Sequence, residues 1–195
     1  EYRVGFTPSM VKIFITHGHK ILVETKAGEK IGFSDDQYRE AGATIVPTAA
    51  QVYEAEMVVK VKEPQASEIA MLKEGQILFC YLHLAPDPEQ TKGLLEKKVI
   101  GIAYETVTNS KGQLPLLTPM SEIAGRIAVQ AGSNLLYMSQ GGKGVILGGI
   151  PGVPPAKVVV IGGGVVGTQA LRMALGLGAD VTVIDSNLDR LRELD

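Results

Sequence analysis

The sequence contains no tryptophan, and only 5% of its 195 residues are aromatic. Proteins that bind single-stranded nucleic acid stack bases on aromatic side chains, so this scarcity argues against such a surface. The charges agree, because 19 basic and 21 acidic residues leave a net charge of −2 without a block of like charges. We therefore expect no nucleic-acid partner.

Cysteine and histidine are also scarce. The single cysteine, Cys80, cannot form an internal disulfide, and its place in an apolar run predicts a buried thiol in a reducing compartment. The three histidines and Cys80 lack the spacing of a metal site, so no metal is expected. No apolar run reaches the roughly 18 residues of a membrane span, and no signal peptide is recognisable. These absences predict a cytoplasmic protein without a membrane partner.

Short apolar runs alternate with helical patterns along the chain. Strands are predicted over 20–24, 44–46, 57–61, 76–81, 99–103, 157–161 and 180–184, and helices after Thr7, after Ser34, over 68–72 and 89–97, from Ser121, over 165–177 and from Asn187. This alternation is typical of βαβ units and a parallel sheet. Residues 141–155, rich in glycine and proline, are interpreted as a loop or linker.

A glycine motif follows the apolar run 158–161. Gly162, Gly164 and Gly167 form G-x-G-x-x-G between a predicted strand and a predicted helix, which is the context of a dinucleotide-binding turn. Gly162 allows the tight turn, Gly164 lets the backbone approach a pyrophosphate, and Gly167 lets the helix pack closely. The amides near Val165 and Val166 would lie at a helix N-terminus, where phosphate is attracted.

The next strand ends in Asp185, where an acid accepts hydrogen bonds from the ribose hydroxyls of NAD and would repel the 2′-phosphate of NADP. Asp185 could instead be a helix N-cap, and Arg190 could either reach the adenosine ribose or be a solvated surface residue. The motif, both strands, the helix and the acid together predict NAD binding. A full fold of this type has six strands, so the second domain holds only its first half.

Polar residues at strand ends mark a second candidate site. Lys62, His83 and Glu105 all follow predicted strands, and ligands of open parallel sheets bind beyond the carboxyl ends of the strands. For Lys62 the alternative is a solvated surface charge, and for His83 a hydrogen-bonded loop histidine. Arg3 and Lys60 lie at further element ends.

At this point the chain closely resembles the alanine dehydrogenases. The resemblance rests on stretches in family order across nearly the whole chain, namely Glu1-Tyr2-Arg3-Val4, Lys60-Val61-Lys62-Glu63-Pro64, Leu82-His83-Leu84-Ala85, Ala103-Tyr104-Glu105-Thr106-Val107, Leu117-Thr118-Pro119-Met120-Ser121 and the glycine motif. It implies an α/β fold with a Rossmann-like substrate domain over residues 1–118, followed by residues 119–195 as the first half of a doubly wound NAD-binding domain.

The resemblance also implies roles for individual residues. Arg3 and Lys62 would hold pyruvate or alanine, and His83 would be a catalytic acid/base. Met120 would line the substrate region and Ser121 the nicotinamide region. We expect Glu105 to belong to the same substrate site.

The implied activity is NAD-dependent oxidative deamination of L-alanine to pyruvate and ammonia, together with the reverse reductive amination. The family is usually a homohexamer, and it has a catalytic aspartate and a returning C-terminal segment that are not found in this sequence. We therefore expect a fragment that is inactive alone. Two alternatives remain: the NAD-binding subunit of a proton-translocating transhydrogenase, and a non-catalytic NAD-binding fragment.

Overall fold

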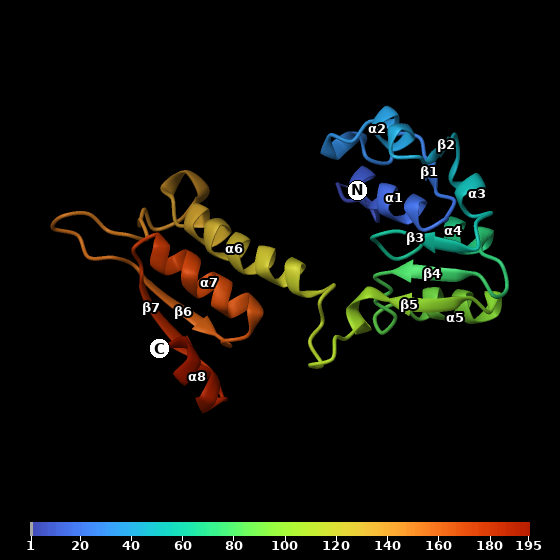
Figure 1. Cartoon of the computed structure of the whole chain (residues 1–195). Helices are drawn as coiled ribbons and strands as arrows, with labels where there is room; N and C mark the ends of the chain where they lie inside the picture. Colours follow the sequence, from blue (N-terminus) through green and yellow to red (C-terminus); the bar gives the residue numbers. More distant parts are fainter. Residues whose placement is uncertain (1) are drawn as a thin grey trace. The chain divides into compact units, whose positions relative to one another are not determined.

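The computed structural model describes residues 2–195 and forms two compact units that divide between Gln113 and Leu114 (Figure 1). Every pair of named strands in both units is parallel, which confirms the predicted α/β class. The division lies slightly before the expected boundary at residue 118. The turn leading into the second unit is joined to its first helix, since the Thr118 hydroxyl donates to the Leu114 carbonyl at 2.9 Å.

Helices and strands alternate along the first unit. Its elements are α1 (Pro8–Thr16), β1 (Leu22–Glu24), η1 (Glu29–Ile31), α2 (Asp35–Glu40), β2 (Thr44–Val46), α3 (Ala49–Val52), β3 (Met57–Val59), α4 (Ala66–Met71), β4 (Ile77–Cys80), α5 (Pro88–Lys97), β5 (Ile100–Ala103) and η2 (Tyr104–Thr106). Thr7 caps α1 and Ser34 forms a capping box on α2, so both helices begin where the sequence predicted.

The strands of the first unit pair in two groups. β1 pairs with β2, and β3, β4 and β5 form a separate three-stranded sheet. The single parallel sheet predicted from the sequence was therefore wrong in its connectivity. Strand alternation in the sequence indicates that the strands are parallel but not which strand edges pair, because edge pairing is decided by packing.

A cavity of about 390 Å³ is lined by residues of both β1 and β3.

Two apolar clusters stabilise the first unit. In the larger one, Leu78 and Cys80 of β4 are fully buried among Val58, Leu72 and Leu94. The predicted burial of Cys80 is confirmed. The smaller cluster contains Val11, Tyr38 and Ala43, packed between α1, α2 and the start of β2. The larger cluster underlies β3, β4 and β5, so the carboxyl ends of these strands rest on a packed base.

The second unit contains α6 (Thr118–Leu135), η3 (Met138–Gln140), β6 (Lys157–Ile161), α7 (Val165–Gly176), β7 (Asp180–Ile184) and α8 (Leu188–Leu194). Helix α6 begins at Thr118 with Pro119 in its first turn, so the predicted start at Ser121 was wrong. Proline is favoured at this first-turn position because its missing N–H needs no partner there.

Helices α6 and α7 pack closely in the second unit (Figure 1). A Cβ on Gly125 of α6 would lie 2.2 Å from the Val166 carbonyl of α7, so only glycine permits this approach. The apolar core between these helices and β6 includes Val129, Val160 and Ala174. This packing fixes the start of α7 against α6 and β6.

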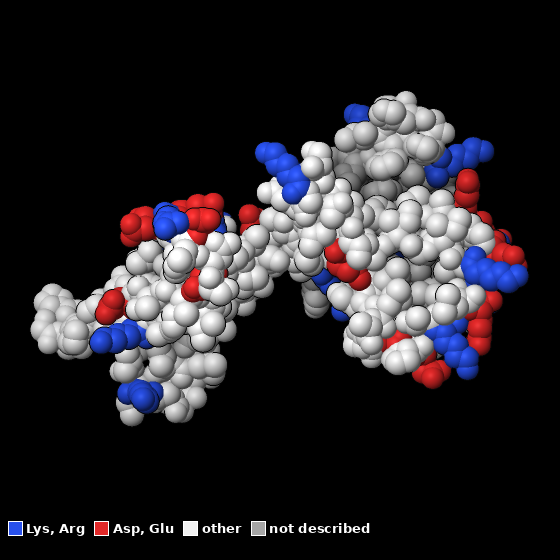
Figure 2. Space-filling view, turned by 90° about the horizontal axis from the view of Figure 1, so that it is seen from below, with Lys and Arg blue, Asp and Glu red and all other residues white. Residues whose placement is uncertain are grey.

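Charged side chains of both signs are interspersed on the face of the molecule shown in Figure 2. None of the helices between residues 2 and 195 combines the length and the hydropathy that a membrane span requires.

Candidate active site

His83 lies in the loop that leaves β4, with an uncommon backbone conformation. Its φ is +46°, in the left-handed region that few non-glycine residues adopt. The carboxylate of Glu105 accepts a hydrogen bond from the His83 amide at 2.7 Å and from the Leu82 amide at 3.1 Å. One acidic side chain therefore holds the strained segment that carries the histidine.

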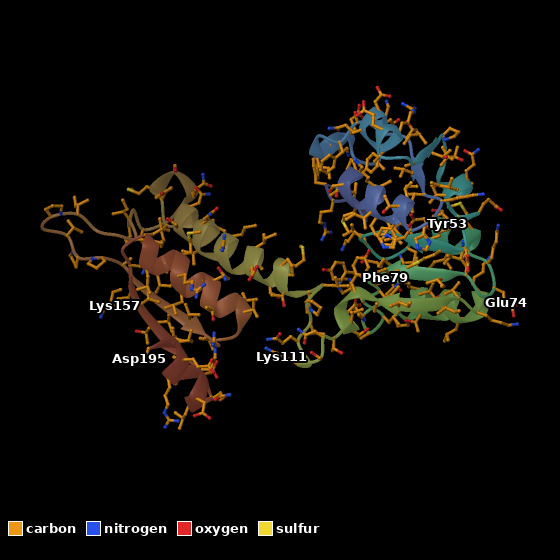
Figure 3. The ribbon with its side chains drawn as sticks, viewed as in Figure 1. Tyr53, Glu74, Phe79, Lys111, Lys157 and Asp195 are labelled. Carbon is orange, nitrogen blue, oxygen red and sulfur yellow. The ribbon has the colours of Figure 1, made fainter. Side chains whose placement is uncertain are left out.

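Contacts among three aromatic rings hold the short helix η2, which contains Glu105, in place. Tyr104 of η2 packs edge-on against Phe79 of β4, which is labelled in Figure 3, with ring centroids 4.4 Å apart. Tyr104 also meets Tyr81 edge-on at 5.1 Å. Burial raises the pKa of the Tyr104 hydroxyl to about 12, so this ring is neutral near pH 7. The carboxylate of Glu105 is thus anchored on β4.

A second carboxylate faces the ring of His83. One oxygen of Glu63 lies 3.2 Å from Nδ1 of His83, and the other lies 3.4 Å from Nζ of Lys62. The side chains of Lys62 and His83 are about half exposed, at 50% and 49%, whereas Glu63 is 26% exposed. The pKa of Glu63 is lowered, chiefly by a hydrogen bond from its own amide; burial opposes this, and the bond with His83 and the charge of Lys62 lower the pKa further.

Arg3 and Tyr81 belong to the same region. The ring of Tyr81 stacks on His83, with centroids 5.7 Å apart and planes 10° apart. Burial raises the pKa of Tyr81, and the charge of Arg3 opposes this rise, which indicates that Arg3 lies near the ring. Arg3 and Lys62 also line the cavity of the first unit. The structure thus brings Arg3, Lys62, His83 and Glu105 into one region of the first unit.

Lys60 differs from Lys62 in its partner. Nζ of Lys60 lies 2.6 Å from the carboxylate of Glu68 on α4, and both side chains are only 22% exposed. Glu68 also accepts a hydrogen bond from the Gln65 amide, which closes the capping box of α4. Lys60 is therefore engaged in the packing of α4, whereas Lys62 extends toward His83 through Glu63.

Sequence reasoning assigned no role to Glu63, although it lies within the Lys-Glu-Pro stretch. The available signal was an acid next to a strand-end lysine, with a strand-end histidine on the neighbouring strand. For Glu105 the observed partners are backbone amides, so its contacts favour a positioning role over the expected substrate-binding role. Which strand-end residues meet depends on the register of β3, β4 and β5, and the sequence alone does not give this register.

The glycine loop of the second unit has the geometry of a dinucleotide turn. Gly162 has a φ of +94°, which disfavours any side chain. A Cβ on Gly167 would lie 1.8 Å from the Gly162 carbonyl, so the helix can approach the loop only with glycine there. Gly164 is the N-cap of α7, and no side chain caps this helix. All residues predicted in the motif line one cavity of about 640 Å³: Gly162, Gly164, Val165, Val166 and Gly167.

Asp185 lies at the end of β7 and holds the glycine loop. Its carboxylate accepts from the Gly163 amide at 2.5 Å and from the Asn187 amide at 2.8 Å. Hydrogen bonds from Asn187 and Gly163, in that order, lower its pKa, so it is ionised at neutral pH. The alternative of a helix N-cap is wrong, because Asn187 caps α8.

Arg190 of α8 also contacts this loop. Its Nε donates to the Gly163 carbonyl at 2.7 Å, and Nη2 donates to the Thr168 hydroxyl at 2.6 Å. The side chain is 31% exposed, so the alternative of a merely solvated arginine does not describe it. Arg190 and Asp185 together bind both polar groups of the Gly163 backbone.

The remaining predicted site residues, Met120 and Ser121, lie in the first turns of α6 in the second unit. Between residues 2 and 195, no cluster of three or more His, Cys, Asp or Glu side chains is arranged to hold a metal ion.

Comparison with known families decides which group these features belong to. The sequence profile described as "Alanine dehydrogenase/PNT, N-terminal domain" matches residues 1–124, and its "C-terminal domain" counterpart matches residues 128–195. The chain belongs to the alanine dehydrogenase/PNT family. Its two predicted domain types, one Rossmann-like and one the first half of a doubly wound fold, are those of this family.

Individual family members show the same relationship. The alanine dehydrogenase of Methanococcus maripaludis is 56% identical over the whole chain, and that of Bacillus subtilis is 55% identical. The chain spans about half of these relatives, 52% and 51% of their lengths. A solved L-alanine dehydrogenase matches the whole chain with a TM-score of 0.94 and 52% identity, over 54% of that structure.

A transhydrogenase from Sinorhizobium meliloti is a more distant family member. Its structure matches the whole chain with a TM-score of 0.81 and 27% identity, over 58% of that structure. The difference in identity favours the alanine dehydrogenases within the family.

Proposed function

We propose that this chain supplies the substrate site and half of the NAD site of an alanine dehydrogenase. The reaction is the oxidative deamination of L-alanine to pyruvate and ammonia, and its reverse. The observation that carries the proposal is the group formed by Lys62, Glu63 and His83 at the ends of β3 and β4, in a chain more than half identical to named alanine dehydrogenases.

The residues have suitable chemistry for this reaction. Arg3 would pair with the substrate carboxylate, since a guanidinium binds a carboxylate through two parallel hydrogen bonds. The Lys62 ammonium would stabilise negative charge that develops on the keto oxygen. His83 would move the proton as substrate interconverts between amine, imine and ketone, because imidazole suits proton transfer near neutral pH.

The second unit fits NAD as the redox partner. The turn without side chains at Gly162 and Gly164, followed by the uncapped start of α7, suits a pyrophosphate. The ionised Asp185 suits the ribose hydroxyls of NAD and disfavours a 2′-phosphate. When bound, NAD accepts the hydride that leaves the substrate Cα. Met120 and Ser121 would then line the substrate and nicotinamide regions.

The family resemblance extends the proposal to assembly and location. We propose a homo-oligomer, a hexamer as in the family, in the cytoplasm, with L-alanine, pyruvate and ammonia as small-molecule partners. Since the chain spans about half of its relatives, these statements concern the whole enzyme.

The test uses the natural full-length enzyme and its His83→Ala and Lys62→Ala variants. We expect His83→Ala to lower turnover by roughly 10²–10⁴-fold, the usual contribution of acid–base catalysis, with NAD binding unchanged. Lys62→Ala should alter both the KM for pyruvate and kcat.

Three outcomes of this test would contradict the proposal. Near-normal turnover of His83→Ala across the pH range would remove the catalytic role. Hydride exchange between NAD(H) and NADP without alanine turnover would favour the transhydrogenase, and NAD binding without either activity would favour a binding module.

A further inference from the structure

We propose that Glu63 is a positioning residue that fixes His83 in one tautomer, with the proton on Nδ1, so that Nε2 is the atom that exchanges a proton with the substrate. This inference rests on the proposed function for the importance of His83. The contact between Glu63 and His83 can nevertheless be tested without any activity.

The tautomer follows from the acceptor. The Glu63 oxygen lies 3.2 Å from Nδ1 of His83. An ionised carboxylate has no hydrogen to donate, so the nitrogen that faces it must carry one. In the neutral ring this leaves Nε2 with its lone pair. The lowered pKa of Glu63 means that the carboxylate is ionised throughout the neutral range.

Glu63 also links the histidine to the lysine. Its second oxygen lies 3.4 Å from Nζ of Lys62. The two cationic groups of the site would repel each other if both were charged, and the shared carboxylate offsets this repulsion. Glu63 can therefore hold Lys62 and a protonated His83 in the same site during turnover.

The main chain of His83 is fixed by other groups. Glu105 binds its amide at 2.7 Å, and Tyr81 stacks on its ring. Removal of the Glu63 side chain therefore leaves the loop anchored, while it releases the tautomer and flip of the His83 ring and the ion pair with Lys62. This separation makes the role of Glu63 accessible to substitution without loss of the loop.

The experiment compares Glu63→Gln and Glu63→Ala with Glu54→Gln in the full-length enzyme. Glu54 is an exposed partner of Lys73 and provides the same chemical change away from the site. We expect Glu63→Ala to lower kcat by roughly 10–100-fold, less than loss of His83 itself. Glu63→Gln, which keeps an acceptor oxygen for the Nδ1 proton, should recover much of this loss. Glu54→Gln should leave kcat unchanged.

The second readout is independent of catalysis. Diethyl pyrocarbonate reacts with neutral imidazole, and peptide mass spectrometry resolves its product at each histidine. With Glu63 in place the lone pair of His83 is on Nε2, so the rate at His83 should change in Glu63→Ala, where the ring can change tautomer and flip, and should be kept in Glu63→Gln. His17, the C-cap of α1, and His19, two residues later, serve as internal references and should react as before.

Two results would overturn the proposal. One is a His83 modification profile in Glu63→Ala that matches the unchanged enzyme. The other is a Glu63→Ala enzyme whose kcat lies within twofold of normal. If instead His83→Ala keeps its turnover, the proposed function fails, while the modification profile still decides whether Glu63 controls the ring.

Discussion

The carboxylate of Asp185 and the amide of Gly163 are joined at 2.5 Å, which links the end of β7 to the middle of the glycine loop. Asp185 therefore shapes the loop as an acceptor, and in the proposed NAD site its charge would also meet the ribose. We expect Asp185→Asn to keep much of the loop geometry while it erodes the preference for NAD over NADP. Asp185→Ala should lose both properties.

The measurement is kcat/KM with each cofactor in the full-length enzyme, together with thermal melting. Asp185→Ala should melt below Asp185→Asn, because an amide that loses its acceptor costs about 1–3 kcal/mol when it is shielded from water. An unchanged preference for NAD in both variants would contradict the ribose role of Asp185.

Gly167 is the position where the fold tolerates a side chain least. Its added Cβ would lie 1.8 Å from the Gly162 carbonyl, so Gly167→Ala should destabilise the protein by about 1–3 kcal/mol and weaken NAD binding. Gly132, which is exposed in α6, is the matched control, since nothing beyond its own stretch of helix lies within 4 Å of its added Cβ. There alanine should stabilise the helix by up to about 1 kcal/mol. Urea unfolding compares the two, and equal effects would show that the close approach at Gly167 is unimportant.

Lys60 and Lys62 should separate stability from catalysis. Lys60→Ala leaves the half-buried Glu68 without its 2.6 Å partner, so it should cost about 1–3 kcal/mol of stability with kcat little changed. Lys62→Ala should leave the melting temperature nearly unchanged and lower kcat/KM for pyruvate. A larger catalytic effect at Lys60 would move the substrate lysine by two positions.

Glu105 should act through the backbone of the histidine loop. Glu105→Ala removes the acceptor of the Leu82 and His83 amides, so we expect lower kcat and lower stability with unchanged NAD affinity. Glu105→Gln keeps an acceptor oxygen and should recover much of both. If Glu105 bound substrate directly, the KM for pyruvate would rise instead, and the glutamine variant would be as impaired as the alanine variant.

Cys80 gives a prediction about alkaline pH. Burial raises the pKa of its thiol from 9.0 to about 12, so the folded protein keeps a proton that the unfolded chain loses. This contribution to stability is complete below about pH 9 and falls as the pH rises toward 12. A Cys80→Ala variant should lose stability less steeply over that range. Because the thiolate is the reactive form, Cys80 should resist iodoacetamide in the folded protein at pH 8 and react after unfolding.

The local features of the fold could be predicted from the sequence. Thr7 with Pro8, and Ser34, mark helix starts because a cap is a contact between near neighbours in the chain. Apolar runs located the strands to within a residue or two. The glycine motif, with Asp185 after the next strand, predicted the loop that the structure contains.

The remaining features depend on contacts between distant residues. Glu63 and His83 are 20 residues apart and Glu105 is 22 residues beyond His83, so their meeting depends on the pairing register of β3, β4 and β5. The division of the first unit into two sheets and the partners of Asp185 depend on packing in the same way. For Ser121 the error was local, since Pro119 was the better signal for a helix start.

Arg190 sets a minimum length for any shortened version of this protein. Its guanidinium binds the Gly163 carbonyl and the Thr168 hydroxyl from the last helix, α8. A polypeptide that stops after β7 keeps the glycine loop and Asp185 but loses the Arg190 guanidinium that binds the loop. The smallest segment that keeps every described contact of the glycine loop must therefore run through α8, and a shorter graft would keep the motif without the arginine that binds it.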